Sequence, residues 1–163
     1  MRGRFSPKDG QLYLTGLRVW QSDAAKDGCF TRVRYTGKPL VTPVDLHVTP
    51  TGVDLVFTGE LDPASATDPE NFSVEQWNYL WSGAYGSPDF SVIDPQRKGR
   101  DLVELSKLTL SADRKTLSLT LADRHPAMQM KIRFKIKAAD GQEVQHEIYN
   151  TVNRIPGQQT TQR

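Results

Sequence analysis

The stretch Val53–Trp77, VDLVFTGELDPASATDPENFSVEQW, constrains the fold more than any other part of the chain. The alternate positions Val53, Leu55 and Phe57 place apolar side chains on one face of an extended strand. A polar, turn-rich segment with two Asp-Pro pairs follows, and the alternation resumes at Phe72. A strand, a polar crossover and a second strand are typical of an antiparallel β-sandwich.

A period of two recurs on both sides of the polar turn SADRK and predicts a β-hairpin. Leu108 and Leu110 precede this turn, and residues 117–121 carry a second apolar row after it. A shorter alternation at residues 44–48 predicts an earlier strand.

The longest alternation in the chain runs from Met128 to Ala138, with apolar side chains at every second position. An Asp-Gly pair then indicates a tight turn, and residues 144–152 are expected to form the last strand. No window shows the 3.6-residue period of a helix. The chain is therefore predicted to be all-β, an immunoglobulin-like antiparallel β-sandwich with a short N-terminal two-strand extension.

The chain is expected to have three parts. Residues 11–15 and 29–35 predict two short strands joined by a polar loop through Trp20, and Gly and Pro residues between 37 and 43 predict a linker. The predicted organisation is an N-terminal β extension at 1–38, the sandwich at 39–155 and a disordered polar tail at 156–163.

Cys29 is the only cysteine, which excludes an internal disulfide and a cysteine-based zinc or haem site. Because it stands at the start of a predicted strand, we expect it to be a small buried hydrophobe.

Composition indicates a packed globular chain without a strong preference for charged partners. Hydrophobic residues make up 37% and charged residues 25%, and the net charge of +2 predicts no binding to nucleic acid.

No apolar run approaches the roughly 20 residues that a membrane span needs. The amino-terminal segment MRGRFSPKDGQ lacks the apolar stretch of a secretory signal.

No residue pattern typical of catalysis is found, so the chain is predicted not to be an enzyme and to bind no cofactor. Its three histidines show no HxH or HxxxH spacing, and no serine lies in a GxSxG sequence. Glu60, Asp62, Asp68 and Glu70 crowd the polar crossover, where they could bind calcium or start turns.

A row of basic residues, Lys131, Arg133, Lys135 and Lys137, is expected on the solvent face of the longest strand. Such a row could attract an acidic partner, or it could discourage edge-to-edge pairing of sheets.

The strongest candidate for function is an aromatic cluster in the irregular stretch 77–101. Its members are Trp77, Tyr79, Trp81, Tyr85 and Phe90. Aromatic rings on a loop suit a protein docking surface or a platform for stacking sugars. They could also fold back as a small core of their own, and the sequence leaves all three alternatives open.

Two extended phrases carry a family resemblance. The segments DGQLYLTGLRVWQ and DGCFTRVRYTGKP resemble the closing blade of β-propellers in sorbosone/glucose-dehydrogenase-like bacterial proteins, a group described as membrane-bound or haem-associated dehydrogenases. The segments from TGVDLVFTGELDPASATDPENFSVEQWNY through LSADRKTLSLTL to MQMKIRFKIKAADGQ are similar to the bacterial Ig-like domain that follows this propeller. Together they cover nearly the whole chain.

The resemblance implies a non-catalytic accessory domain of a larger exported protein, periplasmic or secreted. Such a domain would pack against or position the propeller and a possible cytochrome module. Only about one blade is present and no CxxCH motif occurs, so a propeller cofactor site cannot form from this chain. The alternative function is a carbohydrate-binding module that uses the aromatic loop at 77–90.

Overall fold

The computed structural model describes residues 2–17 and 28–157. The chain divides into two compact units, residues 1–39 and 40–163, which are described separately below as unit 1 and unit 2. The predicted loop through Trp20 and residues 158–163 of the predicted disordered tail lie outside the described residues.

Unit 1 is an antiparallel sheet of three strands, where the sequence predicted two. The strands are β1 (Arg2–Phe5), β2 (Leu12–Leu17) and β3 (Gly28–Val33), in the order β1-β2-β3. β1 leaves little apolar signal in the sequence, because three of its four residues are arginine or glycine.

The prediction that Cys29 is buried is wrong, because Cys29 is exposed. Among the described residues of unit 1 no second layer covers this sheet, and none of these residues is buried. A β-sheet gains an interior only when a second layer covers one of its faces.

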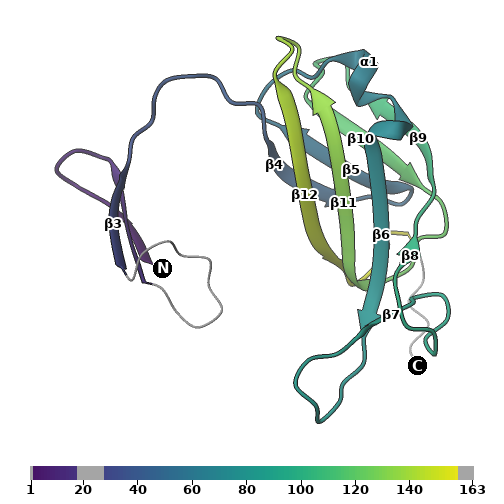
Figure 1. The fold of residues 1–163 in the computed structure, drawn as a ribbon. Coiled ribbons are helices and arrows are strands. Elements are labelled where there is room, and N and C mark those ends of the chain that lie inside the picture. The colour runs from purple at the N-terminus through teal and green to yellow at the C-terminus, as the bar shows by residue number, and fades with distance from the viewer. Residues whose placement is uncertain (1, 18–27, 158–163) are drawn as a thin grey trace. The chain divides into compact units, whose positions relative to one another are not determined.

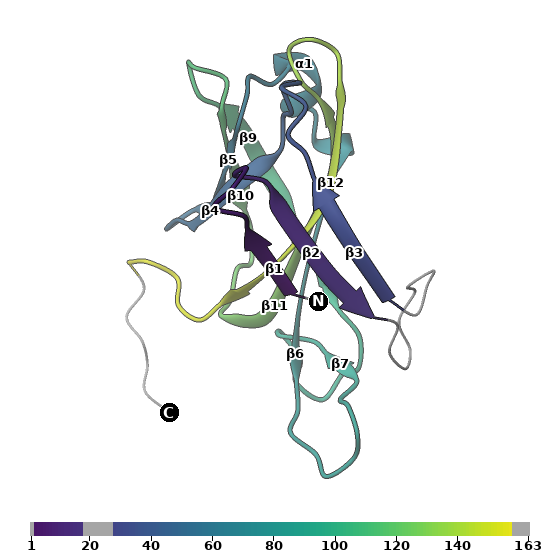
Figure 2. The same cartoon turned by 90° about the vertical axis from the view of Figure 1, so that its left-hand side faces the viewer.

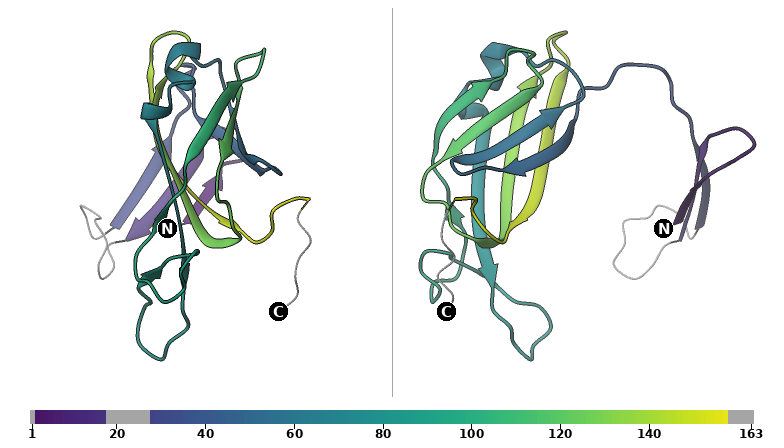
Figure 3. Two further views of the ribbon diagram at one scale, coloured as in Figure 1. Left: turned by 90° about the vertical axis from the view of Figure 1, so that its right-hand side faces the viewer. Right: turned by 180° about the vertical axis from the view of Figure 1, so that it is seen from behind.

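Unit 2 is a sandwich of two antiparallel sheets, which confirms the predicted all-β antiparallel architecture (Figure 1). The four-stranded sheet, at the front in the right-hand view of Figure 3, consists of β4 (Pro43–Val48), β5 (Gly52–Phe57), β10 (Thr116–Leu121) and β9 (Leu105–Leu110), in that order. The five-stranded sheet has the order β12 (Glu143–Val152), β11 (Ala127–Lys137), β6 (Phe72–Tyr79) and β7 (Asp89–Phe90), with β8 (Asp101–Leu102) also paired to β6.

The core lies between the two sheets and is built from the alternating rows that the sequence displays. Val53, Leu55 and Phe57 of β5 are buried, as are Leu117, Leu119 and Leu121 of β10. The ring of Phe134, on β11 in the other sheet, lies 5.8 Å from the ring of Phe57 and 5.9 Å from that of Phe72. The predicted hairpin is formed by β9 and β10, which are antiparallel neighbours in the four-stranded sheet.

One residue of the longest strand departs from the predicted alternation. Met128 is half exposed, whereas Ala127 and Met130 are both buried. The pairing register of β11 with β12 shifts between Ala127 and Met130. A bulge of this kind changes the phase of the strand, so the inward row begins at Met130.

The polar crossover contains two short helical turns, α1 (Pro63–Ala66) and η1 (Pro69–Asn71). Asp62 Oδ2 accepts a hydrogen bond from Ser65 N at 2.8 Å, and Asp68 Oδ1 accepts one from Glu70 N at 3.0 Å. Both Asp-Pro pairs thus start turns, since the aspartate caps the amino end and proline occupies the first helical position.

Candidate docking loop

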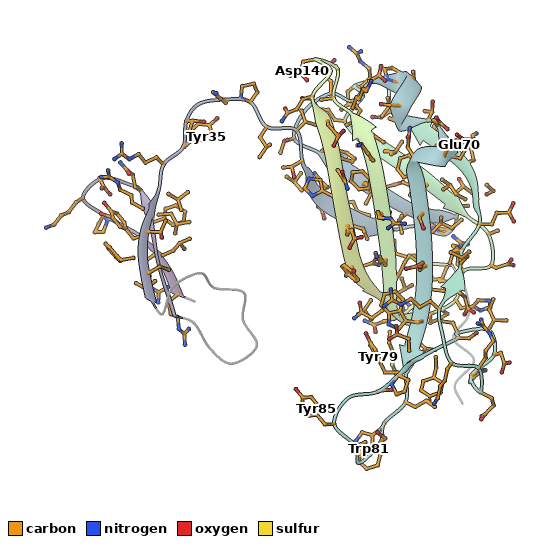
Figure 4. All side chains as sticks on the ribbon, viewed as in Figure 1. Tyr35, Glu70, Tyr79, Trp81, Tyr85 and Asp140 are labelled. Atoms are coloured by element: carbon orange, nitrogen blue, oxygen red, sulfur yellow. The ribbon has the colours of Figure 1, made fainter. Side chains whose placement is uncertain are left out.

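The five aromatic residues predicted as a site do not form one cluster. Trp77 is buried at 2% exposure, whereas Trp81 is 95% exposed and Tyr85 fully exposed. Tyr79 and Phe90 lie between these extremes. Figure 4 shows Trp81 and Tyr85 at the tip of a loop, with Tyr79 nearer the sheet. A small aromatic core therefore does not form at the tip.

This aromatic loop, residues 80–88, connects β6 to β7 and has the sequence LWSGAYGSP. It contains no charged side chain, and its apolar residues Leu80, Trp81 and Tyr85 are all exposed. Seen from the side, it extends beyond the sheets at the end of the sandwich opposite α1 (Figure 2). A neutral, aromatic tip of this kind suits contact with a neutral surface.

Backbone and side-chain bonds close the base of the loop. Tyr79 of β6 pairs with Asp89 of β7, and Leu80 N donates a hydrogen bond to Ser87 Oγ at 3.1 Å. The positive φ of 81° at Gly86 is a conformation that glycine adopts without steric cost.

Arg100 bridges the two strands at the base of the loop. Its Nε donates to Asp89 Oδ2 at 2.8 Å, and its Nη1 lies 3.3 Å from Glu75 Oε2. The guanidinium carbon also lies 3.9 Å from the centre of the Trp77 ring. The hydrogen bond to Asp89, and after it the one to Glu75, raises the pKa of Arg100, so its guanidinium group stays protonated.

Trp77 is buried on the outer face of the five-stranded sheet and does not belong to the core between the sheets. Val74 of β6 belongs to the core, and Gln76, two positions further on, is buried on the same side of the strand. Side chains alternate along a strand, so Trp77 points to the opposite side. In the sheet Trp77 pairs with Gln129 of β11. The ring packs edge-on against Tyr149 at 6.4 Å and lies beneath Arg100. Trp77 is therefore the anchor of the loop base, a role that its sequence position alone does not reveal.

Residues 91–97 fold around the buried carboxylate of Asp101, which is 4% exposed. Its carboxylate accepts hydrogen bonds from Ser91 Oγ at 2.7 Å, Val92 N at 2.6 Å and Ile93 N at 3.2 Å, and pairs with Arg97. Burial opposes ionisation, but these hydrogen bonds and the Arg97 charge outweigh it and lower the pKa of Asp101.

This Asp101 network holds residues 91–100 against the loop base. Gly99 N donates to the carbonyl oxygen of Asp89 at 2.8 Å, and Ser91 N donates to that of Arg97 at 2.9 Å. The stretch 77–101, predicted as one irregular segment, is therefore divided into an exposed aromatic tip at residues 80–88 and a base held by hydrogen bonds and ion pairs.

The predicted basic row on β11 is partly neutralised by the neighbouring strand. Lys131 Nζ lies 3.2 Å from Glu147 and Lys135 Nζ lies 3.0 Å from Glu143, both on β12. Glu147 raises the pKa of Lys131. These cross-strand pairs make the row a poor candidate for a polyanion site.

A metal site was the other chemistry considered for this chain. Within residues 2–17 and 28–157 no group of three or more His, Cys, Asp or Glu side chains could hold a metal ion. The crossover carboxylates proposed for calcium are engaged locally, since Asp62 and Asp68 cap turns and Glu60 pairs with Arg114. The described part of the chain also contains no helix long and apolar enough to cross a membrane.

Comparison with known proteins found no matching family model, no matching curated protein and no matching solved structure.

Proposed function

We propose that this chain is a non-catalytic accessory domain that docks on another domain of a larger, exported, dehydrogenase-like protein and helps to position its catalytic modules. The observation that carries the proposal is the exposed, uncharged aromatic tip on a braced base. Trp81 and Tyr85 are almost wholly accessible, while Trp77 and Arg100 fix the strands that present them.

Exposed aromatic rings contribute strongly to protein interfaces because a large apolar area becomes buried with few rotatable bonds. A preorganised loop loses less conformational entropy on binding than a free segment does. The absence of charge from residues 80–88 favours a partner surface that is itself neutral and apolar.

The docking proposal is tested by titrating the chain with a recombinant β-propeller domain of the sorbosone/glucose-dehydrogenase type in a calorimeter. We expect Trp81→Ala and Tyr85→Ala each to weaken binding at least tenfold. Tyr35→Ala is the matched control, because Tyr35 is also an exposed ring, at 89%, but lies outside the loop. Equal affinities for all variants would contradict docking through this loop.

The second candidate function is carbohydrate binding through the same rings, which the exposure of Trp81 and Tyr85 also supports. Aromatic faces stack on the apolar faces of sugars, so ligand would change the fluorescence of an exposed tryptophan. Titration with soluble polysaccharides separates the two functions. A fluorescence change in the wild-type chain that Trp81→Ala abolishes would favour the carbohydrate function.

In this proposal the chain itself turns over no sugar. We expect no dye-linked dehydrogenase activity from the purified chain, even with added quinone cofactor and calcium. Measurable turnover would exclude a purely accessory role, whether or not the loop docks.

A further inference from the structure

The base of the aromatic loop is held on its β11 side by a methionine sulfur. Backbone pairing between β6 and β11 extends as far as Trp77 and Gln129. Beyond this pair, side chains supply the acceptors: Met128 N donates to Asn78 Oδ1 at 2.9 Å, and Tyr79 N donates to Met128 Sδ at 3.2 Å. The thioether of Met128 therefore binds Tyr79, the last residue of β6 before the loop.

The bulge in β11 directs this side chain away from the core. β11 advances three positions from Ala127 to Met130 while its partner β12 advances two. Ala127 and Met130 are both buried, so the additional residue between them leaves Met128 at the surface. Thr151 Oγ1 of β12 donates to the carbonyl oxygen of Met128 at 2.9 Å, which fixes the backbone of the bulge.

Met128 differs from Met130 in access to solvent. Met128 is 50% exposed, whereas Met130, the other methionine among the described residues, is 2% exposed. Exposure largely decides how readily a thioether is oxidised to the sulfoxide. The bulge thus presents a reactive sulfur at the one point where that sulfur also carries a strand contact.

We propose that Met128 is a site of reversible oxidation by hydroperoxides and that its oxidation loosens the base of the aromatic loop. The sulfur attacks the hydroxyl oxygen of the peroxide and the O–O bond breaks, while the hydroxyl proton passes to the departing oxygen. The products are methionine sulfoxide and one molecule of water or alcohol, so the sulfur is oxidised and the peroxide is reduced. Sulfoxide reductases reverse this modification.

The geometry makes the thioether contact incompatible with the sulfoxide. A hydrogen bond from nitrogen to oxygen takes about 2.9 Å by itself. The 3.2 Å between Tyr79 N and Met128 Sδ therefore leaves no room for an oxygen atom between them. An oxygen added on the other side of the sulfur withdraws electron density from it and makes it a poorer acceptor. Both products release the amide of Tyr79 from the sulfur.

The change should stay local to the β11 side of the loop base. Arg100 still joins the strands on the other side through Asp89 and Glu75, and Leu80 N still donates to Ser87 Oγ. Oxidation therefore increases the mobility of the loop without unfolding the sandwich. This inference goes beyond the docking function, because it concerns the loop itself and holds for any binding partner.

The first test treats the full chain with hydrogen peroxide and assigns the added oxygen to single residues by tandem mass spectrometry. Cys29→Ser serves as the background, because Cys29 is the only thiol, is exposed and would react as well. We expect Met128 to be oxidised faster than Met130 in the same molecules by about a factor of ten or more. Equal rates would overturn the proposal.

The second test measures amide hydrogen exchange by NMR in the same chain before and after oxidation. The amide of Tyr79 should exchange roughly fivefold faster after oxidation, while the amides of β5 and β10 keep their rates. Methionine sulfoxide reductase should restore the slow exchange of Tyr79. An unchanged rate at Tyr79 would overturn the proposal, as would an equal increase throughout β5 and β10, which would mean that unit 2 unfolds as a whole.

Two variants assign the effect to one sulfur. Met128→Leu keeps an apolar side chain but has no acceptor, so Tyr79 should exchange fast without peroxide and show no further change with it. Met130→Leu is the matched control, because it removes the buried sulfur and should respond to peroxide as the wild type does. A response that persists in Met128→Leu would overturn the proposal. None of these measurements uses a binding partner, so their outcome is independent of the docking test.

Discussion

Single residues decide how closely the strands of the sandwich approach one another, and Gly52 shows this most directly. A Cβ atom added at Gly52 would overlap the carbonyl oxygen of Leu119 and lie 2.8 Å from its carbonyl carbon. The obstacle is backbone of the paired strand β10, which cannot move aside as a flexible side chain could. Glycine is therefore required here by space rather than by its dihedral freedom.

We expect Gly52→Ala to destabilise unit 2 by about 1–3 kcal/mol or more, since overpacking forces a backbone shift. Gly83→Ala is the matched control, because nothing lies within 4 Å of an added Cβ at that position in the aromatic loop. Denaturant unfolding curves of the two variants and the wild-type chain measure the difference. Equal stabilities would mean that β5 and β10 separate at little cost.

The two tryptophans of the aromatic region should differ sharply in their effect on stability. Trp77→Ala removes a ring buried under Arg100 and should cost about 3–5 kcal/mol, as large-to-small changes at buried sites do. Trp81→Ala changes a ring that is 95% exposed and should stay within about 0.5 kcal/mol of the wild type. A denaturant melt of each variant checks this, and a large loss at Trp81 would contradict an exposed loop tip.

At the scale of elements, the Asp101 network determines whether residues 91–100 hold their shape. Asp101→Asn keeps the size of the side chain but removes its negative charge. That charge pairs with Arg97 and accepts hydrogen bonds from the backbone amides of Val92 and Ile93. We expect a loss of about 1–3 kcal/mol at neutral pH, the cost of disturbing buried charged hydrogen bonds. Asp94→Asn is the control on the same loop, because Asp94 is exposed.

The pH dependence of this loss follows from the lowered pKa of Asp101. The stabilising effect is fully present above the ordinary value of 3.8 and disappears as the pH falls below it through the lower pKa of the folded state. The stability gap between the wild type and Asp101→Asn should therefore narrow below pH 3.8. A gap that stays constant on acidification would show that the charge of Asp101 is not what holds the loop.

Strands that face the core are predictable from sequence because burial imposes a period of two on them. The rows of β5, β10 and β11 were recognised for this reason, and Met128 was misplaced because a bulge shifts the phase of its strand. The two-residue strands β7 and β8 are too short to show any period. The bridge from Arg100 to Glu75 joins residues far apart in the chain, so no local pattern could have indicated it.

At the scale of the whole molecule, the two units differ in whether they possess an interior. Every fully buried apolar residue of the described chain lies between Val53 and Ile155, inside unit 2. The described residues of unit 1 are exposed or partly buried, and the unit spans 39 residues. Chains below about 40 residues usually need a disulfide, a metal or association to fold.

We therefore expect a fragment of residues 40–163 to fold alone, with a cooperative thermal transition followed by circular dichroism. A fragment of residues 1–39 should show no such transition, because none of its described residues, 2–17 and 28–39, is buried. Absence of a cooperative transition from the fragment 40–163 would mean that the core of unit 2 is not sufficient to fold it.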